Sequence, residues 1–440
     1  MKPIHVGLCG VGTVGGGTAT VLKRNCEEIA RRAGRPIVIR AAANRELDRA
    51  RELVGEGVEL FDDALQVARH PDIDIVVELI GGTTIAKEVV LTAIEQGKHV
   101  VTANKKLIAE YGNEIFARAQ EKGVMVAFEA AVAGGIPIIK ALREGLTANK
   151  IEWVAGIING TSNFILTEMR DKGAAFADVL AEAQRLGYAE ADPTFDIEGH
   201  DAAHKLTIMS AIAFGIPVQF DKAYLEGISK LQAIDIKYAQ ELGYRIKLLG
   251  VTRRRPNGIE LRVAPTLIPA RRLIANVDGV MNAVLVKGDA VGATLYYGAG
   301  AGAEPTASAV IADLVDVTRL ATADPENRVP HLAFQPSAMA DLPILPIDEV
   351  ETCYYLRLNA TDKPGVLADV TRILADAGIS VDALLQRPVS ETEGDGERAD
   401  IIVLTHLAVE KHINAALAKI EALDSITGKV VKLRLEHLNG

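Results

Sequence analysis

Two lysines stand where the sequence supports proton transfer. Asp201 and Lys205 are four residues apart at the start of an apolar run, so on a helix they share one face. A carboxylate beside a lysine at the mouth of a core can tune the ammonium for acid–base chemistry. Lys105 follows an apolar strand, at the carboxyl end where open parallel sheets bind ligands. An ordinary helix salt bridge and two solvated lysines at 105–106 are the alternatives.

Carboxylates gather just before Asp201. Glu190, Asp192 and Asp196 lie within seven residues, and such a cluster could hold a substrate ammonium group, a plain acidic loop being the alternative. His200 and His204 also share a helix face, but without a matching third ligand a zinc site is disfavoured.

A glycine-rich loop follows the first predicted strand. It reads Gly10, Val11, Gly12, Thr13, Val14, Gly15, a G-x-G-x-x-G pattern between a strand at 4–8 and a helix predicted over 14–33. The three glycines would allow a tight turn, close approach of a pyrophosphate and helix–strand packing. The helix N-terminus favours phosphate. The pattern predicts a bound dinucleotide rather than a ligand-free turn.

The end of the second predicted strand bears on which dinucleotide binds. Asn44, Arg45 and Glu46 follow the strand at 36–43, where an NAD site usually has an acidic residue for the ribose hydroxyl. Arg45 could pair with a 2′-phosphate, so NADP is favoured. NAD is possible because Glu46 would be the acidic partner if the boundary shifts.

The elements that position these residues form three regions. Strands and helices alternate up to about residue 133, which predicts an α/β doubly wound parallel sheet of Rossmann type. An inserted α+β region over 134–299 includes a basic turn at 253–258, expected to be solvated. Helix 306–322 follows the glycine-rich loop at 298–302 and belongs, with 300–324, to the first domain. Prolines over 325–348 predict a linker, and 349–440 has the order βαββαβ of a ferredoxin-like fold.

Composition narrows the class of protein. The 440 residues carry a net charge of -10, which argues against a nucleic-acid partner. Three cysteines cannot form a disulfide framework. No uncharged run is long enough to span a membrane and no signal peptide is present, so a cytoplasmic protein is expected.

Several segments together resemble the homoserine dehydrogenase family. They are the glycine loop, TANKK at 102–106, FEAAVAGGIPII, GIINGTSNFIL, GYAEADPTFDIEGHDAAHKL and GAGAGAEPTASAV, in the family's order along the whole chain. The resemblance implies NAD(P)-dependent interconversion of L-homoserine and L-aspartate 4-semialdehyde, in threonine, methionine and isoleucine biosynthesis. It also implies a homodimer or homotetramer, with the inserted region forming the subunit contact.

The resemblance also implies roles for individual residues. Lys205 would donate the proton, and Asp201 would orient Lys205 or a water molecule. Lys105 would stand beside the reaction centre and the cofactor. The substrate would contact Glu190, Asp196, Gly160 and Thr161, and Gly302 would approach the cofactor. A structural sodium ion would be held by Glu129 and by the carbonyl groups of Val132, Gly134 and Ile136.

The C-terminal region resembles the ACT domain. The segments LNATDKPGVLA from Leu358 and AGIS from Ala377 carry this likeness, which implies an amino-acid effector, with threonine as the natural one. A module for oligomerisation alone is the alternative. Two other functions are weaker: an aspartate-semialdehyde dehydrogenase needs a nucleophilic cysteine, for which Cys9, Cys26 and Cys353 are badly placed, and a non-catalytic sensor would not need Lys105, Asp201 and Lys205.

Overall fold

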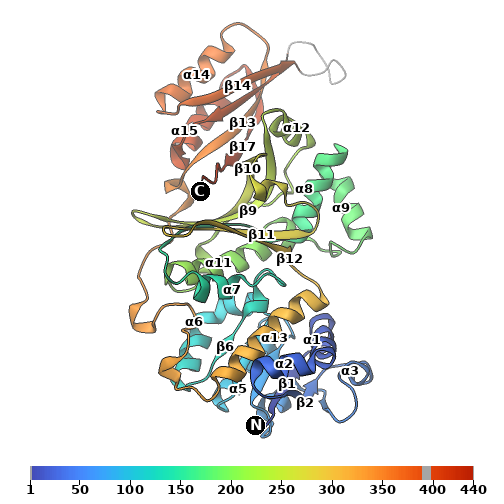
Figure 1. The fold of residues 1–440 in the computed structure, drawn as a ribbon. Helices are drawn as coiled ribbons and strands as arrows, with labels where there is room; N and C mark the ends of the chain where they lie inside the picture. Colours follow the sequence, from blue (N-terminus) through green and yellow to red (C-terminus); the bar gives the residue numbers. More distant parts are fainter. Residues whose placement is uncertain (1, 389–397, 440) are drawn as a thin grey trace.

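The computed structural model describes residues 2–388 and 398–439 (Figure 1). The acidic turn at 391–397 lies outside the described residues. In the part of the chain that is described, no helix is both long and apolar enough to cross a membrane.

The N-terminal domain is a parallel sheet with the strand order β3-β2-β1-β4-β5-β6, the order of a dinucleotide-binding fold. Its strands are β1 (Ile4–Cys9), β2 (Ile37–Ala43), β3 (Glu59–Phe61), β4 (Ile75–Glu78), β5 (His99–Thr102) and β6 (Val126–Ala127). The helices around it are α1 (Thr13–Arg24), α2 (Cys26–Ala33), α3 (Leu47–Val54), α4 (Ala64–Arg69), α5 (Thr84–Glu95), α6 (Lys105–Glu121) and the returning α13 (Ala303–Leu320). The predicted Rossmann-type sheet is confirmed.

Three helix predictions in this domain were wrong in their limits. The helix expected over 14–33 is two helices, because Asn25 leaves the helical conformation between α1 and α2. The sequence pattern predicts a helix over 113–122, but the helix begins at Lys105, where the Asn104 side chain accepts a hydrogen bond from the Leu107 amide at 3.0 Å and caps it. The returning helix begins at Ala303, three residues earlier than predicted.

The central region is built on antiparallel strands. They are β7 (Ile151–Ile157), β9 (Tyr244–Arg255), β10 (Gly258–Pro269), β11 (Met281–Gly288) and β12 (Gly292–Ala299), with the short β8 (Tyr224–Leu225) beside β10. Its helices are α7 (Ile138–Lys140) continued by a π-turn at 141–145, α8 (Gly160–Lys172), α9 (Phe176–Arg185), α10 (Thr194–Ile197), α11 (His200–Phe214) and α12 (Ala233–Glu241).

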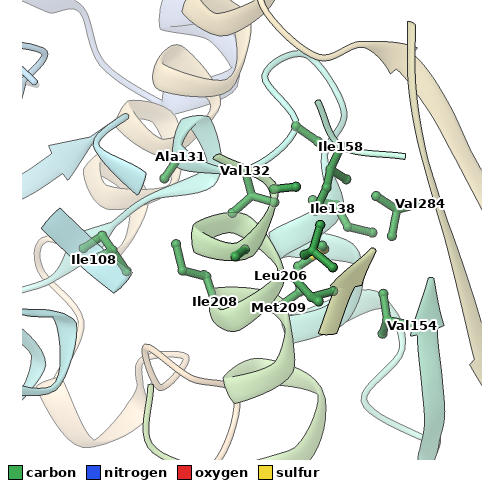
Figure 2. Packing of buried hydrophobic residues seen from close by; sticks show 14 of the residues in the cluster. Ile108, Ala131, Val132, Ile138, Val154, Ile158, Leu206, Ile208, Met209 and Val284 are labelled. Carbon is green, nitrogen blue, oxygen red and sulfur yellow. The ribbon is translucent and has the colours of Figure 1, made fainter. Parts of the chain in front are cut away.

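Helix α11, of the central region, packs against both the N-terminal domain and the strands of the central region. Every residue from Asp201 to Phe214 is buried, which is typical of a helix surrounded by protein on all sides. Figure 2 shows Leu206, Ile208 and Met209 of α11 among residues of both domains, with Ile108 of α6 on one side and Val154 of β7 on the other. The first turn of α11 therefore lies at the junction of the two domains.

The C-terminal region has the predicted βαββαβ order. It consists of β13 (Glu351–Thr361), α14 (Val366–Asp376), β14 (Val381–Pro388), β15 (Arg398–Thr405), the short β16 (Ala408–Val409), α15 (Glu410–Glu421) and β17 (Ile426–Leu435). A cavity of about 330 Å³ lies at the turn before α14 and is lined by Asp362, Lys363, Gly365 and Gln386 among others.

The sheet of the C-terminal region is continuous with that of the central region. Strand β17 pairs in parallel with β10, with Thr266 opposite Arg434, so the strand order runs β12-β11-β7-β9-β10-β17-β13-β15-β14. The expectation of a solvated basic turn at 253–258 is confirmed for Pro256 and Asn257, the exposed turn between β9 and β10, but it was wrong for the arginines. Arg253 and Arg255 belong to β9 and pair with the buried Glu260, and Arg253 also reaches Glu436 at 2.8 Å.

The proline-rich segment at 325–348 is not a free spacer. Short 3-10 helices at Pro325–Asn327, Pro336–Ala338 and Ile347–Glu349 interrupt it. Its backbone is fixed to the central region, because the Ala340 amide donates to the Gly215 carbonyl at 2.7 Å and Ile344 pairs with Ile259. The domain limits drawn from sequence stay a prediction.

Candidate active site

A buried lysine and a carboxylate occupy the first turns of α11. The Nζ of Lys205 donates to Oδ2 of Asp201 at 2.7 Å and to the Ile158 carbonyl at 2.7 Å. Burial lowers the pKa of Lys205, against the opposing effect of Asp201. Burial by itself would raise the pKa of Asp201, but the charges of Lys205 and Lys105 hold it well below its usual range. The pair is an ion pair whose lysine gives up its proton more readily than a surface lysine.

Lys105 reaches the same carboxylate from the other domain. Its Nζ lies 3.0 Å from Oδ1 of Asp201, and 36% of its side chain is exposed. The charge of Asp201 raises the pKa of Lys105. One carboxylate thus accepts from two ammonium groups, one buried and one open to solvent.

Asn159 organises this cluster and was not singled out from the sequence. Its Nδ2 donates to Oδ2 of Asp201 at 2.9 Å and to Oδ1 of Asp196 at 2.7 Å. Its Oδ1 accepts from the Ser162 amide at 2.8 Å, which makes Asn159 the N-cap of α8. The signal that could have found it is an asparagine directly before Gly160, at the start of a helix.

The other predicted substrate residues surround this cluster. Asp196, on α10, is half-buried, and burial together with the charge of Asp201 raises its pKa. Glu190 is exposed on the loop before α10, close enough for its charge to act on Lys105. Thr161 donates to the Tyr188 carbonyl at 2.7 Å. At Gly160, a Cβ atom would lie 2.7 Å from the Val280 carbonyl oxygen, so a larger residue does not fit.

The glycine loop has the geometry that a dinucleotide requires. Gly10 has a φ of 96°, and at Gly15 a Cβ would lie 2.1 Å from the Gly10 carbonyl oxygen. At Gly12 a Cβ would meet nothing within 4 Å, so this position faces open space at the N-terminus of α1. Gly17, two residues beyond the motif, packs against the carbonyl of Ala303, where a Cβ would lie at 2.5 Å. This glycine holds α13 against α1.

Two more predicted cofactor residues lie around this loop. Asn44, at the end of β2, accepts from the Val11 amide at 3.2 Å. Arg45 is exposed beside it, as is Glu46. Gly302 precedes α13 with a φ of 124°, directly before Ala303, which contacts α1. Residues from the beginning and the end of the domain's sequence therefore meet at the carboxyl ends of the parallel strands.

The predicted sodium residues form a bend between the two domains. The carboxylate of Glu129 is buried and accepts from the Ile139 and Lys140 amides at 2.9 and 2.8 Å. Burial and the charge of Asp313 raise its pKa to about 7. Ala133 and Gly134 both have positive φ values, of 55° and 48°. A buried carboxylate without a salt bridge among the described residues fits a nearby cation.

Zinc and thiol chemistry receive no support. No group of three or more metal-ligating side chains exists among the described residues, and His204 packs between the rings of Phe195 and Phe220. Cys9 and Cys353 are buried, and burial raises the pKa of both thiols, that of Cys353 to about 11. Raised values disfavour a thiolate nucleophile.

A dinucleotide-binding domain joined to a lysine–carboxylate centre defines a nicotinamide-dependent oxidoreductase. Residues 137–315 match the homoserine dehydrogenase family, 10–129 match the homoserine dehydrogenase NAD-binding domain, and 354–424 match the ACT domain. The chain belongs to the homoserine dehydrogenase family, and it is an oxidoreductase that acts on a CH–OH group.

Individual relatives agree with this assignment. A homoserine dehydrogenase from Pseudomonas aeruginosa is 65% identical over 440 residues, the full length of both chains. The crystal structure of one from Thiobacillus denitrificans is 72% identical with a TM-score of 0.95, covering 100% of this chain and 99% of that one. A hyperthermophilic archaeal homoserine dehydrogenase in complex with NADPH is 26% identical with a TM-score of 0.61, covering 72% of this chain and 98% of that one.

Proposed function

We propose that this chain interconverts L-aspartate 4-semialdehyde and L-homoserine with NADP, as a step in threonine, methionine and isoleucine biosynthesis. The observation that carries the proposal is that the Asp201 carboxylate binds both Lys205 and Lys105. This cluster lies at the junction of the dinucleotide-binding domain and the central region. Family membership supplies the class of reaction, and this cluster supplies groups suited to it.

Lys205 is the proposed proton donor to the aldehyde oxygen. An ammonium group has three N–H donors, and Asp201 and the Ile158 carbonyl occupy two of them. The third is left for the substrate oxygen. Because burial lowers the pKa of Lys205, its proton moves to a developing alkoxide more easily than that of an exposed lysine.

Asp201 and Lys105 support this transfer. Asp201 fixes the direction of the Lys205 ammonium, and Lys105 adds a second positive charge that favours the developing negative oxygen. Lys105 is also the more exposed of the two lysines, so we assign it the edge of the site that faces the cofactor.

The amino-acid end of the substrate is assigned to the loop before α11 and to the start of α8. The carboxylates of Glu190 and Asp196 suit the substrate ammonium group. The amide nitrogens at Gly160 and Thr161 belong to the first turn of α8, where the helix N-terminus favours the substrate carboxylate. Holding both ends of the substrate fixes its reacting carbon.

The cofactor is assigned to the loop of Gly10, Val11, Gly12, Thr13, Val14 and Gly15, with Gly302 and Lys105 on its other side. When bound, the nicotinamide supplies or accepts the hydride. Arg45, exposed at the end of β2, suits the 2′-phosphate of NADP, although NAD as a second cofactor is compatible with Glu46 beside it. The related archaeal enzyme was solved with NADPH.

Glu129 and the carbonyl groups of Val132, Gly134 and Ile136 are the proposed ligands of a structural sodium ion. Oxygen ligands with a single carboxylate suit a hard cation of low charge. An ion there would stabilise the bend between the two domains and lower the pKa of Glu129, which burial otherwise raises to about 7.

The C-terminal cavity is the proposed effector site, with threonine as the ligand. The backbone at Gly365 begins α14 and offers free amide groups beside Asp362 and Lys363. We further propose a homodimer or a homotetramer, because β12 is an edge strand whose Tyr297 is 59% exposed. Threonine titration with gel filtration separates feedback inhibition from assembly alone.

The decisive experiment is the oxidation of NADPH by aspartate semialdehyde in the wild type and in Lys205→Met. We expect turnover in the wild type and a loss of at least about 100-fold in kcat in the variant, with NADPH binding retained. Lys140→Met, which removes a lysine paired with Asp316, is the control for general effects. Normal turnover in Lys205→Met would exclude it as the donor.

A further inference from the structure

Arg434 connects the C-terminal region to the central region. It lies on β17, is 1% exposed, and binds two carboxylates from different parts of the chain. Its guanidinium donates to Glu410 on α15 at 2.6 Å and to Glu226, in the segment after β8, at 2.7 Å. The ring of Tyr224 lies 4.7 Å from the same guanidinium. Through Glu226, this buried arginine of the C-terminal region therefore contacts the central region, which holds the proposed substrate residues.

The segment that follows Glu226 is pressed against the residues before α11. A Cβ atom at Gly227 would lie 2.6 Å from the Ile197 carbonyl oxygen and 2.2 Å from Oε2 of Glu198. The Ile228 amide donates to the Ile197 carbonyl at 2.8 Å. No side chain fits between the two segments, and the Glu226 amide also donates to the Val263 carbonyl of β10 at 2.9 Å, so the position of this segment defines where Ile197 packs.

Ile197 is the last residue of α10, and Asp196 directly precedes it. Asp196 accepts from Asn159, which also donates to Asp201. Two backbone segments in direct contact therefore link Arg434 to the carboxylate that binds both lysines. The path consists of tightly packed segments and charged hydrogen bonds, which transmit displacement better than a flexible loop does.

We propose that Glu226 is a positioning residue for the substrate loop at 190–199, and that its bond to Arg434 makes substrate affinity depend on the C-terminal region. The inference rests on the proposed function, since it assigns that loop to the substrate. Glu226 is not among the residues assigned to the substrate or the cofactor. A ligand that shifts β17 or α15 would therefore change the affinity of the substrate loop for substrate. Bound substrate would change the affinity for that ligand by the same factor.

The test compares Glu226→Ala with Lys432→Ala in the full-length chain. Lys432 lies on the same strand as Arg434 and binds the same Glu410, but its other partner is Asn414, within the C-terminal region. It is a matched control that removes a charge from the same cluster and leaves the bond between Arg434 and Glu226 in place. Glu226→Asp, which keeps the charge on a shorter side chain, tests for rescue.

In Glu226→Ala we expect KM for aspartate semialdehyde to rise by about fivefold or more, with kcat and KM for NADPH little changed. Amide hydrogen exchange over 190–199 and at Ile228 should become faster. Lys432→Ala should change neither quantity, and Glu226→Asp should recover part of the affinity.

The proposal is overturned if Glu226→Ala and Lys432→Ala have the same KM for the semialdehyde, or if exchange over 190–199 is unchanged. If Glu226→Ala is unstable, the isosteric Glu226→Gln carries the same two measurements. If the wild type does not turn over the semialdehyde, the proposed function fails, and hydrogen exchange still decides whether Glu226 positions the loop.

Discussion

The Nζ of Lys105 and the Oδ1 of Asp201 lie 3.0 Å apart across the boundary between the dinucleotide-binding domain and the central region. Lys105 is the first residue of α6, and Asp201 lies in the first turn of α11. The ion pair places the ends of two helices from different domains at one point. Because Asp201 also binds Lys205, the position of one domain sets the charge environment of the proposed proton donor in the other.

A first prediction concerns this charge. The positive charge of Lys105 contributes to lowering the pKa of Lys205. The variant Lys105→Met should therefore raise the pKa of Lys205. Aldehyde reduction requires protonated Lys205, and activity is lost as pH rises through its pKa. The alkaline limb of the kcat profile should therefore move to higher pH, while the maximal rate falls by about 100-fold.

The control for that experiment is Lys106→Met. The neighbouring lysine lies 3.9 Å from Glu110 rather than beside Asp201, so its removal should leave the alkaline limb in place. An unshifted limb in Lys105→Met would show that the two lysines titrate independently.

Arg45→Ala should change cofactor preference. The loss of one charged hydrogen bond to a 2′-phosphate raises KM for NADPH by about tenfold, and KM for NADH should stay the same. Arg49→Ala is the matched control, because Arg49 is a nearby exposed arginine that faces Glu46 at 3.6 Å. Equal changes with both cofactors would rule out recognition of the phosphate by Arg45.

Two glycines of α1 and its loop should respond differently to alanine. Gly12→Ala places a methyl group in open space, so the melting temperature should hardly change while KM for the cofactor rises by about tenfold or more, since the pyrophosphate needs that space. Gly17→Ala forces a methyl group against the Ala303 carbonyl and should cost about 1–3 kcal/mol of stability. Thermal melting with cofactor titration separates the two effects, and a stable Gly17→Ala would contradict the close packing.

Acid should destabilise the chain around β6 through two histidines, His99 of β5 and His331 of the proline-rich segment. His99 accepts from the Met125 amide at 3.0 Å and His331 from the Val126 amide at 3.2 Å, so both ring nitrogens must be unprotonated. Burial lowers the pKa of both histidines to about 4. Below the unfolded value of about 6.5 the unfolded chain binds more protons, and stability falls as pH drops toward 4.

The expected loss is about 1–2 kcal/mol for each histidine between pH 7 and pH 5. Urea unfolding at the two pH values measures it in the wild type and in His331→Asn, which should lose less stability on acidification. Exposed His412→Asn is the control. An equal pH dependence in His331→Asn and the wild type would show that His331 is not a source of acid sensitivity.

The sequence predicts well what depends on local pattern. The glycine loop and the Asp201–Lys205 pair follow from short spacings, and alternating apolar strands and helices indicate the parallel sheet. The start of α6 could not be placed, because the Asn104 cap acts through a side-chain hydrogen bond that leaves no periodic signal. Asn159 was missed for a similar reason, since its importance lies in contacts to Asp196 and Asp201, about 40 residues away.

The continuous sheet formed by the central and C-terminal regions could not be predicted from the sequence. Pairing of β17 with β10 involves only two residue pairs between distant strands, and no local pattern encodes it. Arg253 depends partly on this pairing, because the pairing brings Glu436 beside it. A run of arginines beside proline and glycine is typical of an exposed turn, but Glu260, across the β9–β10 hairpin, pairs with Arg253 and Arg255 and favours their partial burial.

The place of β17 in the sheet has a consequence for synthesis. On the ribosome, β10 emerges long before β17, so its edge at Thr266 and Leu267 has no partner while the intervening chain is made. During that time Arg262 has Glu260 beside it but lacks Glu436, the second of its two carboxylate acceptors in the finished protein. The nascent chain therefore carries a short open stretch of strand edge and an arginine with only one of its two carboxylates, and an open strand edge favours aggregation until β17 is made.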